Sequence, residues 1–102
     1  MADALPIGVP RSELAELCRR HQIVRLSLFG SVLREDFGPS SDIDILAEFD
    51  PGAKVTFFTL ARIQDELSDL LERTVDLHLP RSLSPHLRDR VVSQARELYV
   101  AA

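Results

Sequence analysis

The sequence predicts a single α/β (α+β) domain on a small mixed β-sheet, with the element order α-β-α-β-α-β-α. A chain of 102 residues has the length of one domain, so we expect one domain over residues 1–102. Three short apolar and β-branched runs, at 23–29, 43–49 and 75–79, predict three strands. Helical periodicity before, between and after these runs predicts the helices.

Two helices are expected in the first half of the chain. Residues 1–10 contain two prolines and a glycine and should form a loose lead-in. Ser12 is a suitable N-cap for a first helix over about 13–21. A short helix is predicted over 31–37, and the Gly38-Pro39-Ser40 sequence ends it.

Two further helices are expected in the second half. Apolar residues recur at helical spacing between Thr56 and Leu71 and predict a long helix there. Ser84 is a good N-cap with Pro85 at the first helical position, and this last helix is expected to run to about Tyr99. Its predicted apolar stripe is Leu87, Val91, Ala95 and Leu98.

Composition excludes several classes of function. The net charge of −4 argues against a general nucleic-acid binder, which would show a basic footprint. No apolar stretch approaches membrane-spanning length, and no signal peptide is visible at the N-terminus. Cys18 is the only cysteine, so no internal disulfide can form, and we expect a buried, inert thiol. These features predict a reducing, cytoplasmic setting.

The residues with the clearest chemical meaning lie around the first two predicted strands. Gly30-Ser31 follows the first strand, and Asp42 and Asp44 stand at the start of the second, with ten residues between Ser31 and Asp42. Alternation along a strand puts Asp42 and Asp44 on one face, where their charges repel unless a cation lies between them. Mg²⁺ is such a cation and usually brings phosphates with it. The alternative is a solvated strand face, although aspartate is a poor strand residue.

Bringing these residues into one site constrains the pairing of the strands. Gly30-Ser31 ends strand one and Asp42 begins strand two, so the two strands should be antiparallel. Asp76 lies near the start of the third strand and can join Asp42 and Asp44 only if strands two and three are parallel. The segment that contains the 56–71 helix is long enough for the right-handed crossover which this requires.

Four residues are candidates for binding phosphate. Gly30 removes side-chain bulk where the backbone would approach a phosphate, and Ser31 begins a helix whose free N–H groups favour anions. Taken alone, the pair could be an ordinary strand-to-helix turn with a serine cap. Arg34 lies one helical turn after Ser31 and can face the same pocket, where it could contact phosphate or pair with an aspartate of the site. Ser41 is expected to support the start of the aspartate strand.

The Gly-Ser pair, the ten-residue spacer, the Ser41-Asp42-Ile43-Asp44 block, Arg34 and the later Val75-Asp76-Leu77 together resemble the signature of the DNA polymerase β-like nucleotidyltransferases. The resemblance covers most of the chain. It is closest to the MNT-type proteins, small members of this superfamily that act as antitoxins beside HEPN-domain toxins. It implies the Polβ-like nucleotidyltransferase fold.

The resemblance also implies a reaction. Asp42, Asp44 and Asp76 would bind Mg²⁺, with two ions in all, and AMP would pass from ATP to a tyrosine hydroxyl of a HEPN-family ribonuclease toxin. One alternative is a non-catalytic antitoxin that acts by binding its toxin. Another is transfer to a small molecule, as in the aminoglycoside-modifying relatives, but those generally carry an additional domain for which this chain has no room.

Several side chains near the site have ordinary alternatives. Asp76 could be an exposed strand aspartate. Glu48 shares the face of Asp42 and Asp44 but lies at the far end of the strand, so it is a weak rival as a ligand. His78 could be a neighbour of the site, but an exposed histidine is the expectation. Phe57 and Phe58 are expected to pack on the sheet, with one ring available to a partner.

Overall fold

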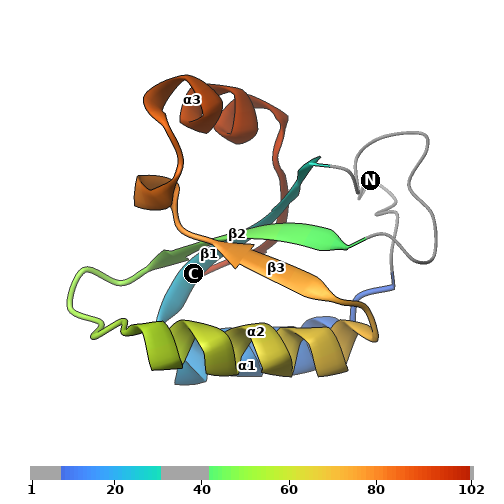
Figure 1. The fold of residues 1–102 in the computed structure, drawn as a ribbon. Helices are drawn as coiled ribbons and strands as arrows, with labels where there is room; N and C mark the ends of the chain where they lie inside the picture. Colours follow the sequence, from blue (N-terminus) through green and yellow to red (C-terminus); the bar gives the residue numbers. More distant parts are fainter. Residues whose placement is uncertain (1–7, 31–41, 102) are drawn as a thin grey trace.

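The structure is a computed structural model that describes residues 8–30 and 42–101 (Figure 1). The predicted 31–37 helix lies outside the described residues. The described elements, in chain order, are α1 (Arg11–Arg20), β1 (Ile23–Phe29), β2 (Ile43–Phe49), α2 (Phe57–Leu71), β3 (Val75–His78), the 3₁₀ turn η2 (Pro80–Ser82), α3 (Pro85–Gln94) and β4 (Arg96–Val100).

The four strands form one mixed sheet in the order β3-β2-β1-β4. Strand β1 pairs antiparallel with β2 on one side and with β4 on the other, whereas β2 and β3 are parallel. This confirms the predicted antiparallel pairing of the first two strands and the parallel pairing of the second and third. Asp44 consequently lies opposite Phe29 on one neighbour and Asp76 on the other.

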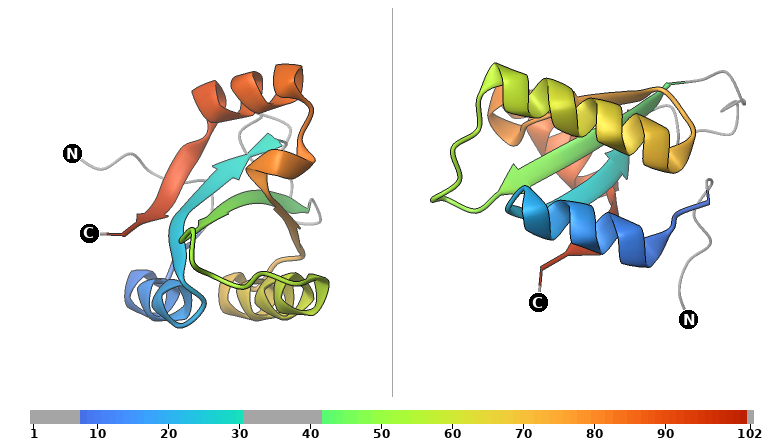
Figure 2. Two further views of the ribbon diagram at one scale, coloured as in Figure 1. Left: turned by 90° about the vertical axis from the view of Figure 1, so that its left-hand side faces the viewer. Right: turned by 90° about the horizontal axis from the view of Figure 1, so that it is seen from below.

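Helices cover the two faces of the sheet unequally. Helices α1 and α2 lie side by side on one face, and α3 lies over the other (Figures 1 and 2). The larger core, beneath α1 and α2, is made of Leu14, Leu17, Cys18, Ile23, Leu26, Leu28, Ile43, Ile45, Ala47, Ile63, Leu67, Leu71, Val75 and Leu98. The smaller core, beneath α3, is made of Phe29, Leu46, Leu83 and Val91. Since residues alternate along β2, Asp44 lies on the α3 side between two isoleucines that face the larger core.

Helix α1 begins two residues earlier than a Ser12 cap predicts. Its N-cap is Pro10, whose carbonyl accepts a hydrogen bond from the Leu14 N–H at 2.9 Å, and no side chain caps the helix. The Ser12 cap prediction is therefore wrong. The Arg11 guanidinium donates to the Leu98 carbonyl at 3.1 Å and attaches the first turn to β4, a contact between residues far apart in sequence.

The predicted last helix is correct at its start and wrong at its end. Ser84 caps α3 through a hydrogen bond from the Leu87 N–H, but the helix stops at Gln94, and Arg96–Val100 is a strand. Without β4, the free edge of β1 would present unpaired backbone groups, and pairing with it satisfies them. The Ala95-to-Leu98 spacing fits a helix locally, but Leu98 is buried in the larger core as a strand residue.

Phe57 and Phe58 do not pack on the sheet as expected. They are 79% and 83% exposed, and their rings contact each other edge to face with centroids 6.1 Å apart. At about 100° per residue, the two positions lie roughly 120° and 140° around α2 from the fully buried Ile63. The first turn of α2 therefore directs both rings away from the sheet.

Candidate active site

Two carboxylates and an imidazole come together on the α3 side of the sheet. Asp44 on β2 and Asp76 on β3 are directly opposite in the parallel register, and His78 follows Asp76 by two residues on the same face. One potential ligand atom from each of the three side chains lies within 4.8 Å of the others. The side chains of Asp44 and His78 are 28% exposed and that of Asp76 is 58% exposed, so the cluster is open on the Asp76 side.

His78 is more enclosed than the sequence suggests. Its Nε2 lies 3.3 Å from Asp44 Oδ1 and 3.4 Å from Asp76 Oδ2. The ring also packs edge to face against Phe29, with centroids 5.1 Å apart. The expectation of an exposed histidine is therefore wrong. The signal for its position was the Asp-x-His alternation of β3, which places both side chains on one face.

Gly30 closes the site at the end of β1. Its φ angle is +77°, a left-handed conformation that favours glycine. A Cβ atom at this position would collide with the Asp44 Oδ2 atom and would lie 3.2 Å from the Asp44 Cγ atom. A glycine is thus required both by the backbone conformation and by the close approach of the Asp44 carboxylate.

Helix α2 fixes the position of β3, and through it that of Asp76. The Ser68 hydroxyl accepts a hydrogen bond from the Val75 N–H at 3.1 Å, and the Gln64 side-chain oxygen accepts one from the Leu77 N–H at 2.9 Å. These two bonds satisfy donors on the outer edge of β3, beside which the described residues place no further strand. Asp76 lies between the two tethered residues, so its backbone is held on both sides.

The other predicted site residues are placed as follows. Asp42 is exposed and directly precedes β2, and it is not among the three residues whose ligand atoms converge. Ser31, Arg34 and Ser41 lie outside the described residues. Glu48, the weak rival, lies at the other end of β2 and pairs with a cation.

That cation is Arg25, which bridges two strands on the α3 side. Its guanidinium lies 3.7 Å from the Glu48 carboxylate on β2 and 3.3 Å from the Glu97 carboxylate on β4. The three side chains are between 37% and 55% exposed, so the interaction adds little stability. Its position explains Glu48 as a surface ion-pair partner rather than a ligand of the Asp44 cluster.

The donor set on β2 and β3 suits a divalent cation. Two carboxylates and one imidazole supply oxygen and nitrogen ligands, and their mutual distances fit a single ion. Such an ion would offset the repulsion between Asp44 and Asp76. A cation held by these three side chains would lie next to Gly30, because the Asp44 carboxylate lies against that glycine.

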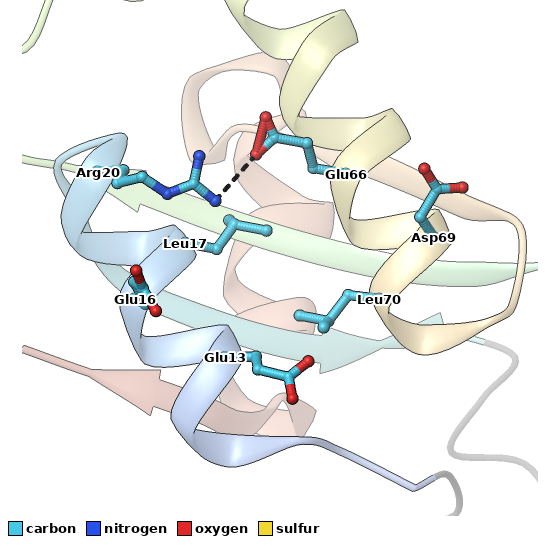
Figure 3. A pocket seen from close by; sticks show the side chains of 7 residues that line it. All are labelled: Glu13, Glu16, Leu17, Arg20, Glu66, Asp69 and Leu70. Atoms are coloured by element: carbon cyan, nitrogen blue, oxygen red, sulfur yellow. Dashed lines mark ion pairs between the residues drawn. The ribbon is translucent and has the colours of Figure 1, made fainter.

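A pocket elsewhere in the structure does not include these residues. It lies between α1 and α2 and is lined by Glu13, Glu16, Leu17, Arg20, Glu66, Asp69 and Leu70 (Figure 3). Arg20 lies 3.5 Å from Glu66 across this pocket, and the His21 Nε2 atom lies 3.0 Å from the same carboxylate. Since α1 and α2 cover the face opposite α3, the sheet separates this pocket from the Asp44 cluster.

Cys18 is fully buried in the larger core. Burial raises the pKa of its thiol from 9.0 to about 12, although the neighbouring Arg19 opposes this shift. The burial confirms that part of the prediction, and a thiol with so high a pKa is expected to be a poor nucleophile. Among the described helices, none is both long and apolar enough to cross a membrane.

The chain has relatives among proteins of known name and structure. The family model described as the nucleotidyltransferase domain matches residues 11–98. MJ0435 of Methanocaldococcus jannaschii, provisionally named a protein adenylyltransferase, is 34% identical over 83% of this chain and 89% of its own length. A solved structure provisionally named a minimal nucleotidyltransferase is 38% identical over 84% of this chain and 86% of that one, with a TM-score of 0.70.

Two similar structures come from toxin–antitoxin complexes. One, described as a toxin–antitoxin with AMP-PNP, is 25% identical over 91% of this chain and 75% of that one, with a TM-score of 0.71. The other, from Shewanella oneidensis, is described as a tri-AMPylated HEPN toxin in complex with an MNT antitoxin. It is 26% identical over 89% of this chain and 70% of that one, with a TM-score of 0.63. Together with the paired carboxylates beside Gly30, these likenesses show that the chain belongs to the nucleotidyltransferase domain family and is an enzyme of its minimal, MNT-type kind.

Proposed function

We propose that this chain is a Mg²⁺-dependent protein adenylyltransferase that serves as the antitoxin of a HEPN-family ribonuclease toxin. It transfers AMP from ATP to a tyrosine hydroxyl of the toxin and thereby silences it. The observation that carries the proposal is the close pair of carboxylates, Asp44 and Asp76, beside Gly30. The adenylyltransferase name of MJ0435 and the AMPylated toxin in the similar complex support a protein acceptor.

Different residues of the site would bind the metal ions and the nucleotide. Asp42, Asp44 and Asp76 would hold the metal ions through their carboxylate oxygens. Two Mg²⁺ ions, when bound, would neutralise the triphosphate and stabilise charge on the attacking and leaving oxygens. By the family motif, the triphosphate would approach the backbone at Gly30, and the missing side chain there leaves room for the Asp44 carboxylate.

Three further residues would contact the nucleotide phosphates. Ser31 would offer its hydroxyl and backbone N–H groups, and Arg34 its guanidinium. Ser41 would support the start of the strand that carries Asp42 and Asp44. These roles rest on the match of this chain to the motif of the family.

The reaction is an in-line displacement at phosphorus. The tyrosine oxygen forms a bond to the α-phosphorus of ATP, the bond from that phosphorus to the bridging oxygen breaks, and pyrophosphate leaves. Asp76 is the more exposed of the two paired carboxylates, and it would accept the proton from the tyrosine hydroxyl. The protein contributes mainly position and neutralisation of charge.

The test is mass spectrometry of the HEPN protein encoded beside this chain, after incubation with this chain, ATP and Mg²⁺. We expect the mass of AMP to appear on a tyrosine of that protein. The double substitution of Asp42 and Asp44 by Asn should abolish the transfer, because amides keep the shape of the carboxylates and lose the charge that holds the ions. Asp65→Asn, at an exposed position of α2, is the matched control and should leave it intact.

The same experiment separates the competing functions. If the intact protein binds the toxin and suppresses its ribonuclease activity without any AMP adduct, the chain is a binding-only antitoxin. If AMP appears on a small-molecule hydroxyl and never on the toxin, the chain is a small-molecule nucleotidyltransferase and the proposal is wrong.

A further inference from the structure

We propose that His78 is a ligand of the same metal centre, and that its imidazole makes the centre favour a first-row transition ion, from Mn²⁺ to Zn²⁺, over Mg²⁺ when no nucleotide is bound. The proposal rests on the metal-binding part of the proposed function and extends it to a residue outside the aspartate motif. It concerns the identity of the ion and its protein ligands rather than the acceptor of AMP.

The distances around His78 fit shared coordination of one ion. Ligand atoms about 2.1 Å from one ion lie roughly 3.0 Å apart in an octahedral arrangement and roughly 3.4 Å apart in a tetrahedral one. The Nε2 atom lies 3.3 Å from the nearer oxygen of Asp44 and 3.4 Å from that of Asp76. The contact with Asp44 is a hydrogen bond in the structure, and it is longer than the about 2.7–2.9 Å of a charge-assisted one. The nitrogen therefore stands at a ligand-to-ligand distance from both carboxylates.

The position of the imidazole is set by its surroundings. The edge-to-face contact with Phe29 limits rotation of the ring, and the side chain is 28% exposed. The strand beneath it is held in register against β2 and tethered to α2 through the Leu77 N–H. A ligand already held in place gives up little conformational freedom when a metal binds, which favours affinity.

The chemical consequence is a change in metal preference. Mg²⁺ favours oxygen ligands and retains several waters, whereas imidazole favours the later transition ions. Adding one nitrogen to two carboxylates should therefore raise affinity along the series from Mn²⁺ to Zn²⁺ far more than it raises affinity for Mg²⁺. A site made only of aspartates would lack this preference.

The alternative is that His78 is only an ion-pair partner of Asp44 and Asp76, and the two readings predict effects of opposite sign. An ion-pair partner competes with the metal for the carboxylates, so its removal would leave metal affinity unchanged or raise it. A ligand contributes to binding, so its removal would lower affinity. We expect His78→Gln to weaken Mn²⁺ binding about tenfold or more.

The experiment uses the full chain with Mn²⁺ alone, with neither nucleotide nor partner present. Free Mn²⁺ is counted by electron paramagnetic resonance during a titration, and pulsed resonance on the bound ion detects coupling to a ¹⁴N nucleus. We expect a nitrogen signal in the parent that disappears in His78→Gln and His78→Phe, the second of which preserves an aromatic contact with Phe29. His86→Gln, at an exposed position of α3, is the control and should retain both affinity and signal.

A parent spectrum without nitrogen coupling, or a His78 variant that binds Mn²⁺ as tightly as the parent, would overturn the proposal. The nitrogen measurement is made on the parent itself, so it does not depend on the folding of any variant. Failure here with AMP transfer intact would refute only the role of His78. Conversely, nitrogen-coupled Mn²⁺ binding without AMP transfer to the toxin would refute only the proposed function.

Discussion

Replacing Gly30 by alanine tests the geometry of the site through stability alone. An alanine at a φ of +77° costs about 1–2 kcal/mol. The new Cβ would also collide with the Asp44 carboxylate and lie 3.3 Å from the Asp44 Cβ atom, so that side chain must leave its preferred rotamer, at about 1 kcal/mol. We expect the free energy of unfolding to fall by about 2–3 kcal/mol, which corresponds to a fall in melting temperature of roughly 10–20 °C.

The assay is thermal unfolding followed by circular dichroism, with EDTA present so that metal binding does not contribute. Gly8→Ala is the matched control, because a Cβ at that position meets nothing within 4 Å, and it should melt within a few degrees of the parent. In the double variant Gly30→Ala/Asp44→Ala, the collision with the carboxylate is absent, and the backbone cost and the 3.3 Å approach of the two Cβ atoms remain. Asp44→Ala should therefore change the free energy of unfolding more favourably in Gly30→Ala than in the parent, by about 1 kcal/mol.

Two results would refute this reasoning. If Gly30→Ala melts with the parent, neither the backbone strain nor the approach of Asp44 is as described. If Asp44→Ala has the same effect on stability with glycine and with alanine at position 30, the two residues are not in contact. The second result would also remove the structural link between the glycine turn and the carboxylate pair.

Further predictions concern the rest of the molecule. Ile63→Ala should lower the free energy of unfolding by about 2–5 kcal/mol, measured by urea denaturation, because its side chain is fully buried, whereas Phe57→Ser and Phe58→Ser should each change it by about 0.5 kcal/mol or less. Cys18 should resist a thiol reagent in the native protein and react fully in denaturant, and rapid native labelling would contradict its burial. Because the Cys18 pKa is raised from 9.0 to about 12 on folding, the unfolded thiol loses its proton first, so stability should fall as pH rises above 9.0, by about 1 kcal/mol between pH 8 and 10. This loss should be absent in Cys18→Ala.

Local sequence patterns predict much of the fold because residues close together in the sequence determine the corresponding helices and strands. The strand at 23–29 has the predicted bounds, and α2 follows the Thr56 cap, whose hydroxyl accepts the Thr59 N–H at 3.1 Å. The pairing of the strands followed from a chemical requirement, that Asp76 reach Asp44. The parallel register satisfies that requirement, although the catalytic roles themselves stay predictions.

The errors arose where distant residues decide the structure. A helical stripe through Ala95 and Leu98 fits the local sequence. In the structure, Arg96–Val100 instead pairs with the otherwise free edge of β1 and forms a strand. The enclosure of His78 depends on Phe29, whose ring reaches it across β2, and no local pattern reports such a contact. Helical periodicity identifies the apolar residues of a helix but not which of its turns lies over the sheet. The expectation that Phe57 packs on the sheet is wrong for this reason.

The larger core and the candidate site are linked through the register of β2. Ile43 and Ile45 are fully buried under α1 and α2, and Asp44 between them faces the other side. A slip of one residue would bury the Asp44 charge and expose both isoleucines, so burial of the isoleucines holds the strand in place against the repulsion between Asp44 and Asp76. Val75, which is 2% exposed, plays the same part for Asp76 on β3. Apolar contacts on the opposite face of the sheet therefore fix the backbone positions of the two carboxylates, while within the site the His78 Nε2 atom lies 3.3 Å from Asp44 and 3.4 Å from Asp76.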